Sequence, residues 1–353
     1  MRGGSSKGLY FRKEDLPADA AVRDRVLVAA MGVDSRQIDG AGGAHPLTSK
    51  VAVVNRSESS DADVDYLFVQ VVVGEGRVDT TPNCGNMLAG VGPFGIETGL
   101  VPVRRETTSV KVRMLNTGNL CELVMQTPNG AITYDGDAHI DGVPGTSAPI
   151  VCNYLDVAGS VCGSLLPTGN VIDEAGGIEV TCVDNGMPVV VLRAADFDIT
   201  GYESPSELDA NTALKRRLES IRLELGPRMN LGDVAKKVVP KMSLISRPRS
   251  GGHVSTRTFI PHDCHAAIGV LGAVSVATAC ILPGSVAAGV AAVPPGAEKR
   301  MSVEHPSGEF SVTLEVGGSA ERPIVQKAGL LRTARLILKG EVQIPRAVWN
   351  GAR

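Results

Sequence analysis

The clearest hydrophobic pattern in the chain is a segment of small apolar residues that follows a polar turn. The turn, residues 81–84, ends with the thiol of Cys84, and residues 87–96 contain no polar side chain. A helix without a polar face must be surrounded by the rest of its domain, and glycine and alanine let neighbouring strands approach it closely. We therefore predict a buried helix over residues 85–99, with Cys84 at its start and a kink at Pro93.

Segments with the pattern of β-strands lie on both sides of this predicted helix. Residues 65–73 form a largely apolar, β-branched run, and residues 109–114 and 120–126 alternate between apolar and polar side chains. Such runs, bounded by turn residues, predict strands. Strands before and after a buried helix indicate a sheet that wraps around it.

The second half of the chain repeats the first. Cys264 aligns with Cys84 without a gap, and upstream of it Lys241 occupies the place of Lys50. A third segment, residues 183–192, corresponds to the glycine-rich start of the chain. Three elements in the same order indicate duplicated domains. Two helix starts around one cleft would suit a substrate with two or three carboxylates.

Composition narrows the class of protein. The 353 residues exceed the usual size of a single core, which favours two domains. A formal net charge of −3 and the lack of a basic stripe argue against nucleic acid as a ligand. The apolar run 266–288 is broken by glycine, proline and polar residues, so we interpret it as a buried helix and expect no membrane partner.

The cysteines indicate a reducing compartment. There are seven, an odd number, and they are dispersed, with no C-x-x-C pair and no signal peptide ahead of them. We therefore expect free thiols in a cytoplasmic protein and no metal site.

Two glycine-rich loops carry further candidate residues. The first contains Ser5 and Ser6 but lacks the spacing of a phosphate-binding P-loop, so we interpret it as the lining of a small-anion site. The second delivers Ser49 and Lys50 to the start of a β-branched strand. A lysine at such a place is often only a strand-end surface residue, so the pattern alone leaves a structural and a functional role open.

Five motifs stand in order along the chain: MRGGSSKG (1–8), GGAHPLTSK (42–50), NCGN (83–86), DNGMP (184–188) and HAAIGVLGAVS (265–275). Together they resemble the PrpF family of cofactor-independent isomerases, which have the diaminopimelate-epimerase type of fold. The resemblance covers essentially the whole chain. Within the family the sequence is most similar to the 4-oxalomesaconate tautomerases, which are 1,3-allylic isomerases of gallate and lignin-derived protocatechuate breakdown.

This resemblance implies an α+β fold of two pseudo-symmetric domains, each a bent, mostly antiparallel, barrel-like sheet around a buried central helix. The N-terminal domain would comprise residues 1–145 with about 335–353, and the C-terminal domain residues 146–334, with the active site in the cleft between them. It also implies an isomerase that moves a C=C double bond of a small unsaturated di- or tricarboxylate, most similar to 4-oxalomesaconate, by a 1,3-proton shift. We expect no cofactor, and we expect the protein to assemble as a homodimer.

The resemblance further implies roles for individual residues. Lys50 would be the catalytic base and Cys84 the second acid/base group beside it. The residues that would bind substrate carboxylates from the first domain are Ser5, Ser6, Ser49, Gly85 and Asn86. From the second domain Lys241 and His265 are candidates, carried by pseudo-symmetry as much as by the family.

Two features depart from the family pattern and leave more than one function open. Family members have residues before Arg-Gly-Gly that supply the first strand, whereas this chain starts at Met1, so we expect a start further upstream or a shorter strand. Cys264 is not expected at its position, and its alignment with Cys84 allows a two-cysteine epimerase or racemase. The motifs also allow a 2-methylaconitate or methylitaconate isomerase of the same family, or a non-catalytic accessory protein that binds a tricarboxylate.

Overall fold

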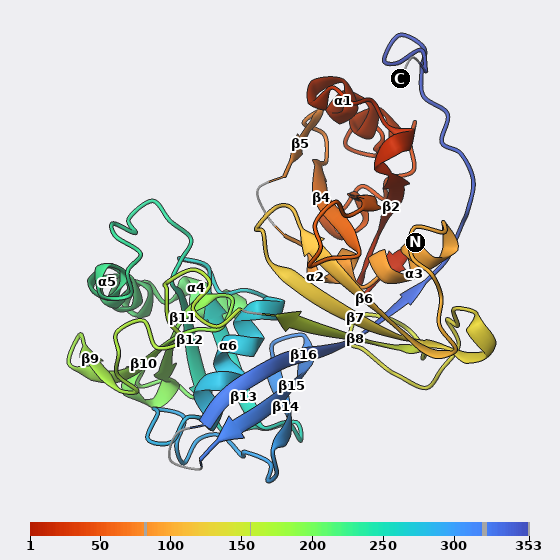
Figure 1. Ribbon diagram of the computed structural model, residues 1–353. Coiled ribbons are helices and arrows are strands. Elements are labelled where there is room, and N and C mark those ends of the chain that lie inside the picture. Colours follow the sequence, from red (N-terminus) through yellow and green to blue (C-terminus); the bar gives the residue numbers. More distant parts are fainter. Residues whose placement is uncertain (81–82, 156, 320–322, 352–353) are drawn as a thin grey trace. The chain divides into compact units, whose positions relative to one another are not determined.

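The computed structural model describes residues 1–80, 83–155, 157–319 and 323–351. Thr81 and Pro82, which open the polar turn before the predicted central helix, lie outside the described residues. The chain divides into two compact units, and the chain end returns to the first of them (Figure 1). The first unit comprises Met1–Leu155 and Leu331–Arg353, and the second comprises Asp156–Leu330.

The first unit is built on a mostly antiparallel sheet. Its strands are β1 (Arg2–Gly3), β2 (Ser6–Arg12), β3 (Lys50–Arg56), β4 (Val64–Val72), β5 (Arg77–Asp79), β6 (Glu106–Met114), β7 (Leu120–Thr127) and β8 (Pro149–Leu155). They pair in the order β1, β2, β3, β4, β6, β7, β8, with β5 on the free part of β4. The pairings β2–β3 and β4–β6 are parallel, and the others are antiparallel.

Helices cover both faces of this sheet. They are α1 (Ala20–Met31), α2 (Gly85–Leu88) and α3 (Val91–Glu97), with 3-10 turns η1 (Lys13–Asp15), η2 (Pro46–Thr48) and η3 (Pro128–Gly130). Val51 and Val53 of β3 pack in one hydrophobic cluster with Leu27 and Met31 of α1. The pair α2 and α3 contacts β1, β2, β3, β6 and β7, so the sheet bends around these two helices. We call the face toward them the inner face.

The central helix is divided into two short helices, and the break lies a few residues before Pro93, where we predict a kink. It is interrupted after Leu88, and a second helix begins at Val91. Pro93 has no N–H to donate to the carbonyl of Ala89, which removes one helical hydrogen bond at this point. Glycine is required at residue 90 within the break, because a Cβ there would overlap the Tyr10 hydroxyl. A four-residue α2 has no long-helix dipole, so its contribution to a site is limited to its free N–H groups.

The second unit repeats the same sheet topology. Its strands are β9 (Asp173–Ala175), β10 (Ile178–Asp184), β11 (Pro188–Arg193), β12 (Lys241–Ser246), β13 (Val254–Phe259), β14 (Glu298–His305), β15 (Gly308–Gly318) and β16 (Pro323–Arg335), whose last residues belong to the first unit. From β10 to β16 the pairings are antiparallel, parallel, antiparallel, parallel, antiparallel and antiparallel, the same series as from β1 to β8. The predicted fold class is confirmed.

The central helix of the second unit is α6 (Val270–Ile281), which contacts β10, β11, β14 and β15. Every residue from Gly272 to Ile281 is buried, as expected for a helix without a polar face. The gapless alignment of Cys264 with Cys84 predicted a second helix start directly after Cys264, and this is wrong. The helix begins five residues later, after Gly269, because Cys264 is held in a β-bridge with Phe259.

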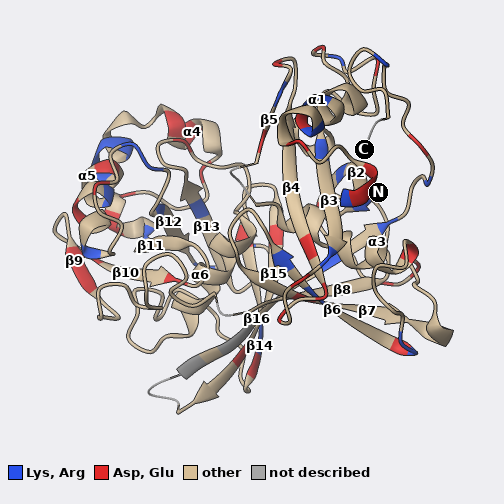
Figure 2. Ribbon diagram, turned by 45° about the horizontal axis from the view of Figure 1, so that its top comes forward, with Lys and Arg blue, Asp and Glu red and all other residues tan. Residues whose placement is uncertain are grey.

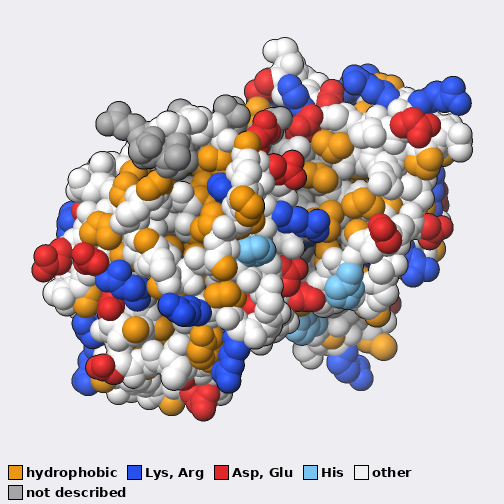
Figure 3. All heavy atoms as spheres, turned by 90° about the horizontal axis from the view of Figure 1, so that it is seen from below, with side chains coloured by type: hydrophobic (Ala, Val, Ile, Leu, Met, Phe, Trp, Pro, Cys, Tyr) orange, Lys and Arg blue, Asp and Glu red, His pale blue; other side chains and the backbone are white. Residues whose placement is uncertain are grey.

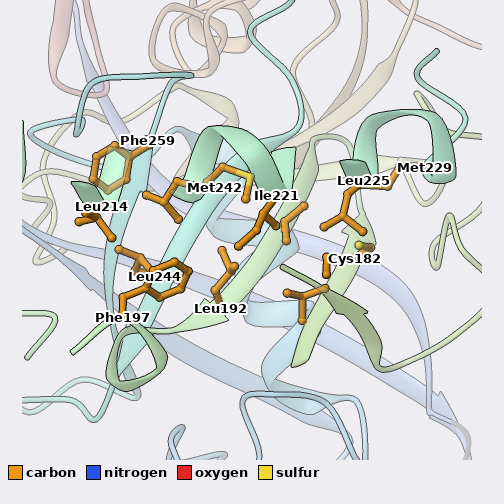
Figure 4. Close-up of a cluster of buried hydrophobic side chains, with 14 of the residues drawn as sticks. Cys182, Leu192, Phe197, Leu214, Ile221, Leu225, Met229, Met242, Leu244 and Phe259 are labelled. Atoms are coloured by element: carbon orange, nitrogen blue, oxygen red, sulfur yellow. The ribbon is translucent and has the colours of Figure 1, made fainter. Parts of the chain in front are cut away.

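A second pair of helices covers the other face of this sheet. The helices are α4 (Pro205–Ala210) and α5 (Thr212–Arg228), with the 3-10 turn η4 (Ala194–Phe197) before them. Figure 4 shows Leu214, Ile221 and Leu225 of α5 lying over Leu192 and Met242 of the strands, within one buried cluster. The opposite side of α5 carries both acidic and basic residues, among them Glu224 and Arg228 (Figure 2).

The last part of the described chain packs on the first unit. Ile344, Val348 and Trp349 pack against the hydrophobic cluster of α1 and β3. On the face seen in Figure 3, acidic and basic side chains are interspersed with hydrophobic ones, in keeping with the small net charge. Within the described ranges, no helix is both apolar enough and long enough to span a lipid bilayer.

Candidate active site

Lys50 lies at the start of β3 with its side chain on the inner face. Side chains alternate along a strand, so Lys50 faces opposite to Val51, which packs under α1. Only 8% of Lys50 is exposed. It is therefore not the strand-end surface lysine that its sequence context allows.

Two side chains of β4 hold the amine of Lys50. Its Nζ donates a hydrogen bond of 3.0 Å to Oε1 of Gln70, which is the residue directly opposite in the strand pairing. It also lies 4.9 Å from the centre of the Phe68 ring, a cation–π distance. Gln70 and Phe68 are two residues apart on β4 and share the inner face.

Cys84 is the residue directly before α2, and it is half-buried. Its N–H donates to Oδ1 of Asn83 at 2.9 Å, and its carbonyl accepts a hydrogen bond of 3.2 Å from the hydroxyl of Tyr66. Tyr66 lies on the same face of β4 as Phe68 and Gln70. The inner face of β4 thus links the start of α2 with the residues that hold Lys50.

Two tyrosines hold α2 against the sheet. The hydroxyl of Tyr10 donates to the carbonyl of Met87 at 2.7 Å, as Tyr66 does to that of Cys84. Burial raises the pKa of each tyrosine well above the usual value for a phenol, and the nearby Cys84 adds to this shift. Both remain phenols at neutral pH and act as fixed hydrogen-bond donors.

Ser5, Ser6 and Asn86 come together as expected for a small polar site. Nδ2 of Asn86 lies 3.1 Å from Oγ of Ser5 and 3.5 Å from Oγ of Ser6. Gly4 has a φ of +51°, and a Cβ there would overlap the amide oxygen of Asn86, so glycine is required at this turn. Gly85 is the first residue of α2, and its N–H has no acceptor within the helix. Hydroxyl, amide and backbone N–H donors of this kind suit a carboxylate.

Ser49 is not brought together with these groups. Its hydroxyl donates to Oε1 of Gln37 at 2.6 Å, and both residues are buried. The same Gln37 oxygen accepts from the N–H of Ala44, so it fastens the glycine-rich loop that leads to Lys50. The hydroxyl of Ser49 therefore contributes to the shape of the loop.

In the second unit, Lys241 occupies the place that Lys50 has in the first. It is the first residue of β12, and burial lowers its pKa below the usual value. In the described part of the chain no group accepts a hydrogen bond from its amine, and a Cβ at Gly269, the residue before α6, would lie 3.4 Å from it. His265 is exposed, and its Nδ1 accepts from the N–H of Ala267 at 3.0 Å.

Cys264 has a different setting from Cys84. It is 7% exposed, and its N–H donates to Oδ1 of Asp209 at 2.6 Å. Burial, together with the nearby Asp209 carboxylate, raises the pKa of its thiol to about 11. A thiol with this pKa stays protonated at neutral pH and is a poor base for a two-cysteine mechanism.

A cavity of about 730 Å³ in the first unit does not belong to this site. It lies at the far end of β3, and Val53, Arg56 and Leu16 are among its lining residues. Neither Lys50 nor Cys84 lines it. No group of three or more His, Cys, Asp and Glu side chains among the described residues is placed to hold a metal ion.

Sequence reasoning missed the residues of β4 that shape the site. Tyr66, Phe68 and Gln70 lie in the run 65–73, for which the pattern predicts a strand and nothing more. One signal was present: Gln70 is the single polar residue between Leu67 and Val73. Its partner across the sheet could not be identified from the pattern.

Comparison with protein families and known proteins gives consistent matches over the chain. The family model described as "PrpF protein" matches residues 1–345. A 4-oxalomesaconate tautomerase of Pseudomonas putida is 58% identical over 352 residues, which cover 99% of this chain and 96% of the relative. A (4E)-oxalomesaconate Delta-isomerase of Novosphingobium sp. is 59% identical over 343 residues, covering 97% and 95% of the two chains.

A solved structure also matches over nearly the whole length of the chain. The crystal structure of a methylitaconate-delta-isomerase superposes with a TM-score of 0.87 at 33% sequence identity. The match covers 98% of this chain and 95% of the other.

Proposed function

The chain belongs to the PrpF family and is an isomerase, and we propose that its substrate is 4-oxalomesaconate, in which it moves a C=C double bond by a 1,3-proton shift. The names of two relatives at 58% and 59% identity support this substrate. The reaction only relocates one proton and one electron pair, so it needs no redox cofactor. With this substrate the enzyme would act in the breakdown of gallate and protocatechuate.

The observation that carries the proposed mechanism is the setting of Lys50. A base must be unprotonated to accept a proton, and the amine of Lys50 is buried and held by a neutral amide instead of a carboxylate. In the proposed first step this amine removes a proton from the carbon next to the double bond. The C–H electron pair is delocalised into the conjugated system, and a dienolate forms.

Cys84 is proposed to complete the shift. Its thiol gives a proton to the other end of the allyl unit, which forms the new C–H bond and leaves a thiolate. Transfer of a proton from the Lys50 ammonium to this thiolate, directly or through water, then restores both groups. No group is oxidised or reduced in the cycle.

Substrate carboxylates are assigned to the polar groups at the start of α2. Ser5, Ser6 and Asn86 hydrogen-bond to one another in the free protein, and an anion would take over these donors. The N–H of Gly85 is proposed to stabilise the dienolate oxygen, a contribution of about 3–4 kcal/mol per donor when such a group is preorganised. Lys241 and His265 of the second unit are candidates for further carboxylate contacts.

The expected setting of the enzyme is the cytoplasm, and a homodimer is the expected assembly. The seven cysteines are all free thiols in the structure, which supports a reducing compartment.

Proton NMR in deuterated buffer tests this proposal. The protein is mixed separately with 4-oxalomesaconate, 2-methylaconitate, methylitaconate and aconitate. We expect double-bond migration with deuterium uptake in 4-oxalomesaconate, and none when Lys50→Met replaces the wild type. Migration in 2-methylaconitate or methylitaconate alone would replace the substrate assignment, and absence of exchange in all four would support a binding protein instead.

A further inference from the structure

We propose that Gln70 is a positioning residue for the reaction, because its amide orients the amine of Lys50 and favours the charged form of that amine less than a carboxylate at the same place would. The inference rests on the proposed role of Lys50 as the base. Gln70 is directly opposite Lys50 in the pairing of β4 with β3, where side chains on one face are in contact distance. The hydrogen bond from Nζ of Lys50 to Oε1 of Gln70 is 3.0 Å long.

The surroundings of Gln70 determine which way its amide points. Its Nε2 lies 3.0 Å from the carbonyl oxygen of Ser49, 3.2 Å from that of Pro46 and 3.2 Å from that of Val71. A rotated amide would set its oxygen against these three oxygens, all of which are acceptors only. The amide oxygen must therefore face Lys50. The carbonyl oxygens of Pro46 and Ser49, in the loop before β3, hold the amide in this orientation.

A neutral acceptor at this position has a chemical consequence. A carboxylate next to an amine favours the ammonium form, which cannot take a proton. Among the described residues no carboxylate forms an ion pair with Lys50, and the next residue in the same row of the sheet, opposite Gln70, is Asp79 on β5. In this row of the sheet Gln70 therefore lies between Lys50 and Asp79.

Other titratable groups lie on the elements packed against this end of β3. They are the amino group of Met1, which donates to the carbonyl of Gly8 opposite Lys50, Lys7 and Tyr10 on β2, Tyr66 on β4, Asp79 on β5, His45 before η2 and Cys84 before α2. Of these, Tyr10 and Tyr66 are neutral phenols at neutral pH because burial raises their pKa. Exchange of Gln70 for glutamate would place a new carboxylate in direct contact with the amine.

The test is the pH profile of kcat/KM for Gln70→Glu. A carboxylate in contact with the base should move the acid-side inflection to higher pH by about one unit or more, with the rate recovering as pH rises. On the acid side this lowers kcat/KM about tenfold for each unit of displacement. The matched control is Gln126→Glu, the same exchange at an exposed position on β7, which should leave the profile unchanged.

A second variant distinguishes the effect of lost positioning from the effect of an added charge. It also provides a test if the glutamate variant does not fold. Gln70→Met keeps the length of the side chain but removes the acceptor, so kcat should fall about tenfold or more at every pH, with KM changed less. Normal kcat and an unchanged profile in a folded Gln70 variant would overturn the role of Gln70 while Lys50→Met stays inactive. An active Lys50→Met would instead overturn the proposed base itself.

Discussion

The two units share one series of strand pairings, yet the side chains at corresponding positions differ in their contacts and burial. In the first unit, Ser5 and Asn86 hydrogen-bond at the junction of the opening turn and the central helix, and both are only half-buried. In the second unit, Asn185 lies at the corresponding turn. Its backbone N–H donates to the hydroxyl of Ser275 and its side-chain amide donates to that of Thr278, both on α6, and all three residues are buried. The polar side chains at this junction are thus partly exposed to solvent in the first unit and buried in the second.

The two lysines also have different surroundings. Lys50 faces Gln70 across the strand pair and donates to it. In the second unit Met242 is paired with Phe259, and the residue that follows, in line with Lys241, is the apolar Ile260. The repeated framework thus places a lysine at the same position in each unit, but among the described residues an amide accepts a hydrogen bond from Lys50 and none does so from Lys241. We conclude that a duplicated fold does not by itself duplicate a site, and four predictions test this asymmetry.

The largest effect is expected from Lys50→Met. Removal of a positioned general base costs about 10²–10⁴-fold in rate, and we expect kcat to fall by about 10³-fold or more. The methionine fills the same volume on the inner face, so the melting temperature should change little. Turnover of 4-oxalomesaconate followed by NMR or ultraviolet absorbance gives kcat. The control Lys111→Met, at an exposed position on β6, should retain full activity; comparable activity in both variants would contradict the role of Lys50.

The next effect concerns the two cysteines. Cys84→Ser should lower kcat about 10²-fold, because a serine hydroxyl donates a proton far less readily than a thiol. The measurement is kcat together with deuterium incorporation at each end of the allyl unit.

Cys264→Ser is the matched exchange in the second unit. The pKa of Cys264 is raised to about 11 by its burial, so its thiol is inert at neutral pH and kcat should stay within about twofold of wild type. Equal losses in the two variants would favour the two-cysteine epimerase mechanism over the lysine mechanism.

A smaller effect is expected on substrate binding when Lys241 is changed. If its amine binds a carboxylate, Lys241→Met should raise KM about tenfold, since a charged hydrogen bond contributes about 1.5–3 kcal/mol. The value of kcat should change much less than in Lys50→Met. Steady-state kinetics gives both constants, and Lys236→Met, an exposed lysine of the same unit, serves as control. A fall in kcat with unchanged KM would show that the two lysines are functionally more alike than their surroundings suggest.

The smallest effect is on the pH dependence of stability. Burial lowers the pKa of Lys241 in the folded state, so the unfolded chain binds this proton more tightly. The penalty is present at neutral pH and fades as pH rises from the folded pKa toward about 10.4, the value in an unfolded chain. Lys241→Met should therefore melt at a higher temperature than wild type at pH 7, with the difference shrinking toward pH 10. Thermal unfolding at several pH values measures this, and a constant difference would argue against a buried charge.

The sequence alone predicted those features that depend on the residue pattern of short segments and on the internal repeat. The apolar segment 87–96 required a surrounding sheet, the repeat required two similar units, and Lys50, Cys84 and Asn86 stood in motifs whose order identified the family. These inferences need no knowledge of which strand lies beside which. They depend on side-chain polarity, turn chemistry and spacing, which are properties of short segments.

Only the tertiary structure decided which side chains meet. The pairing of Gln70 with Lys50 depends on the register between β3 and β4, and that register is set by packing on both faces of the sheet. The turn of Ser49 toward Gln37 and the burial of Cys264 in its bridge likewise depend on contacts between distant segments. Patterns along a chain record the face on which a residue lies, whereas its neighbour across a sheet is a consequence of how the whole domain folds.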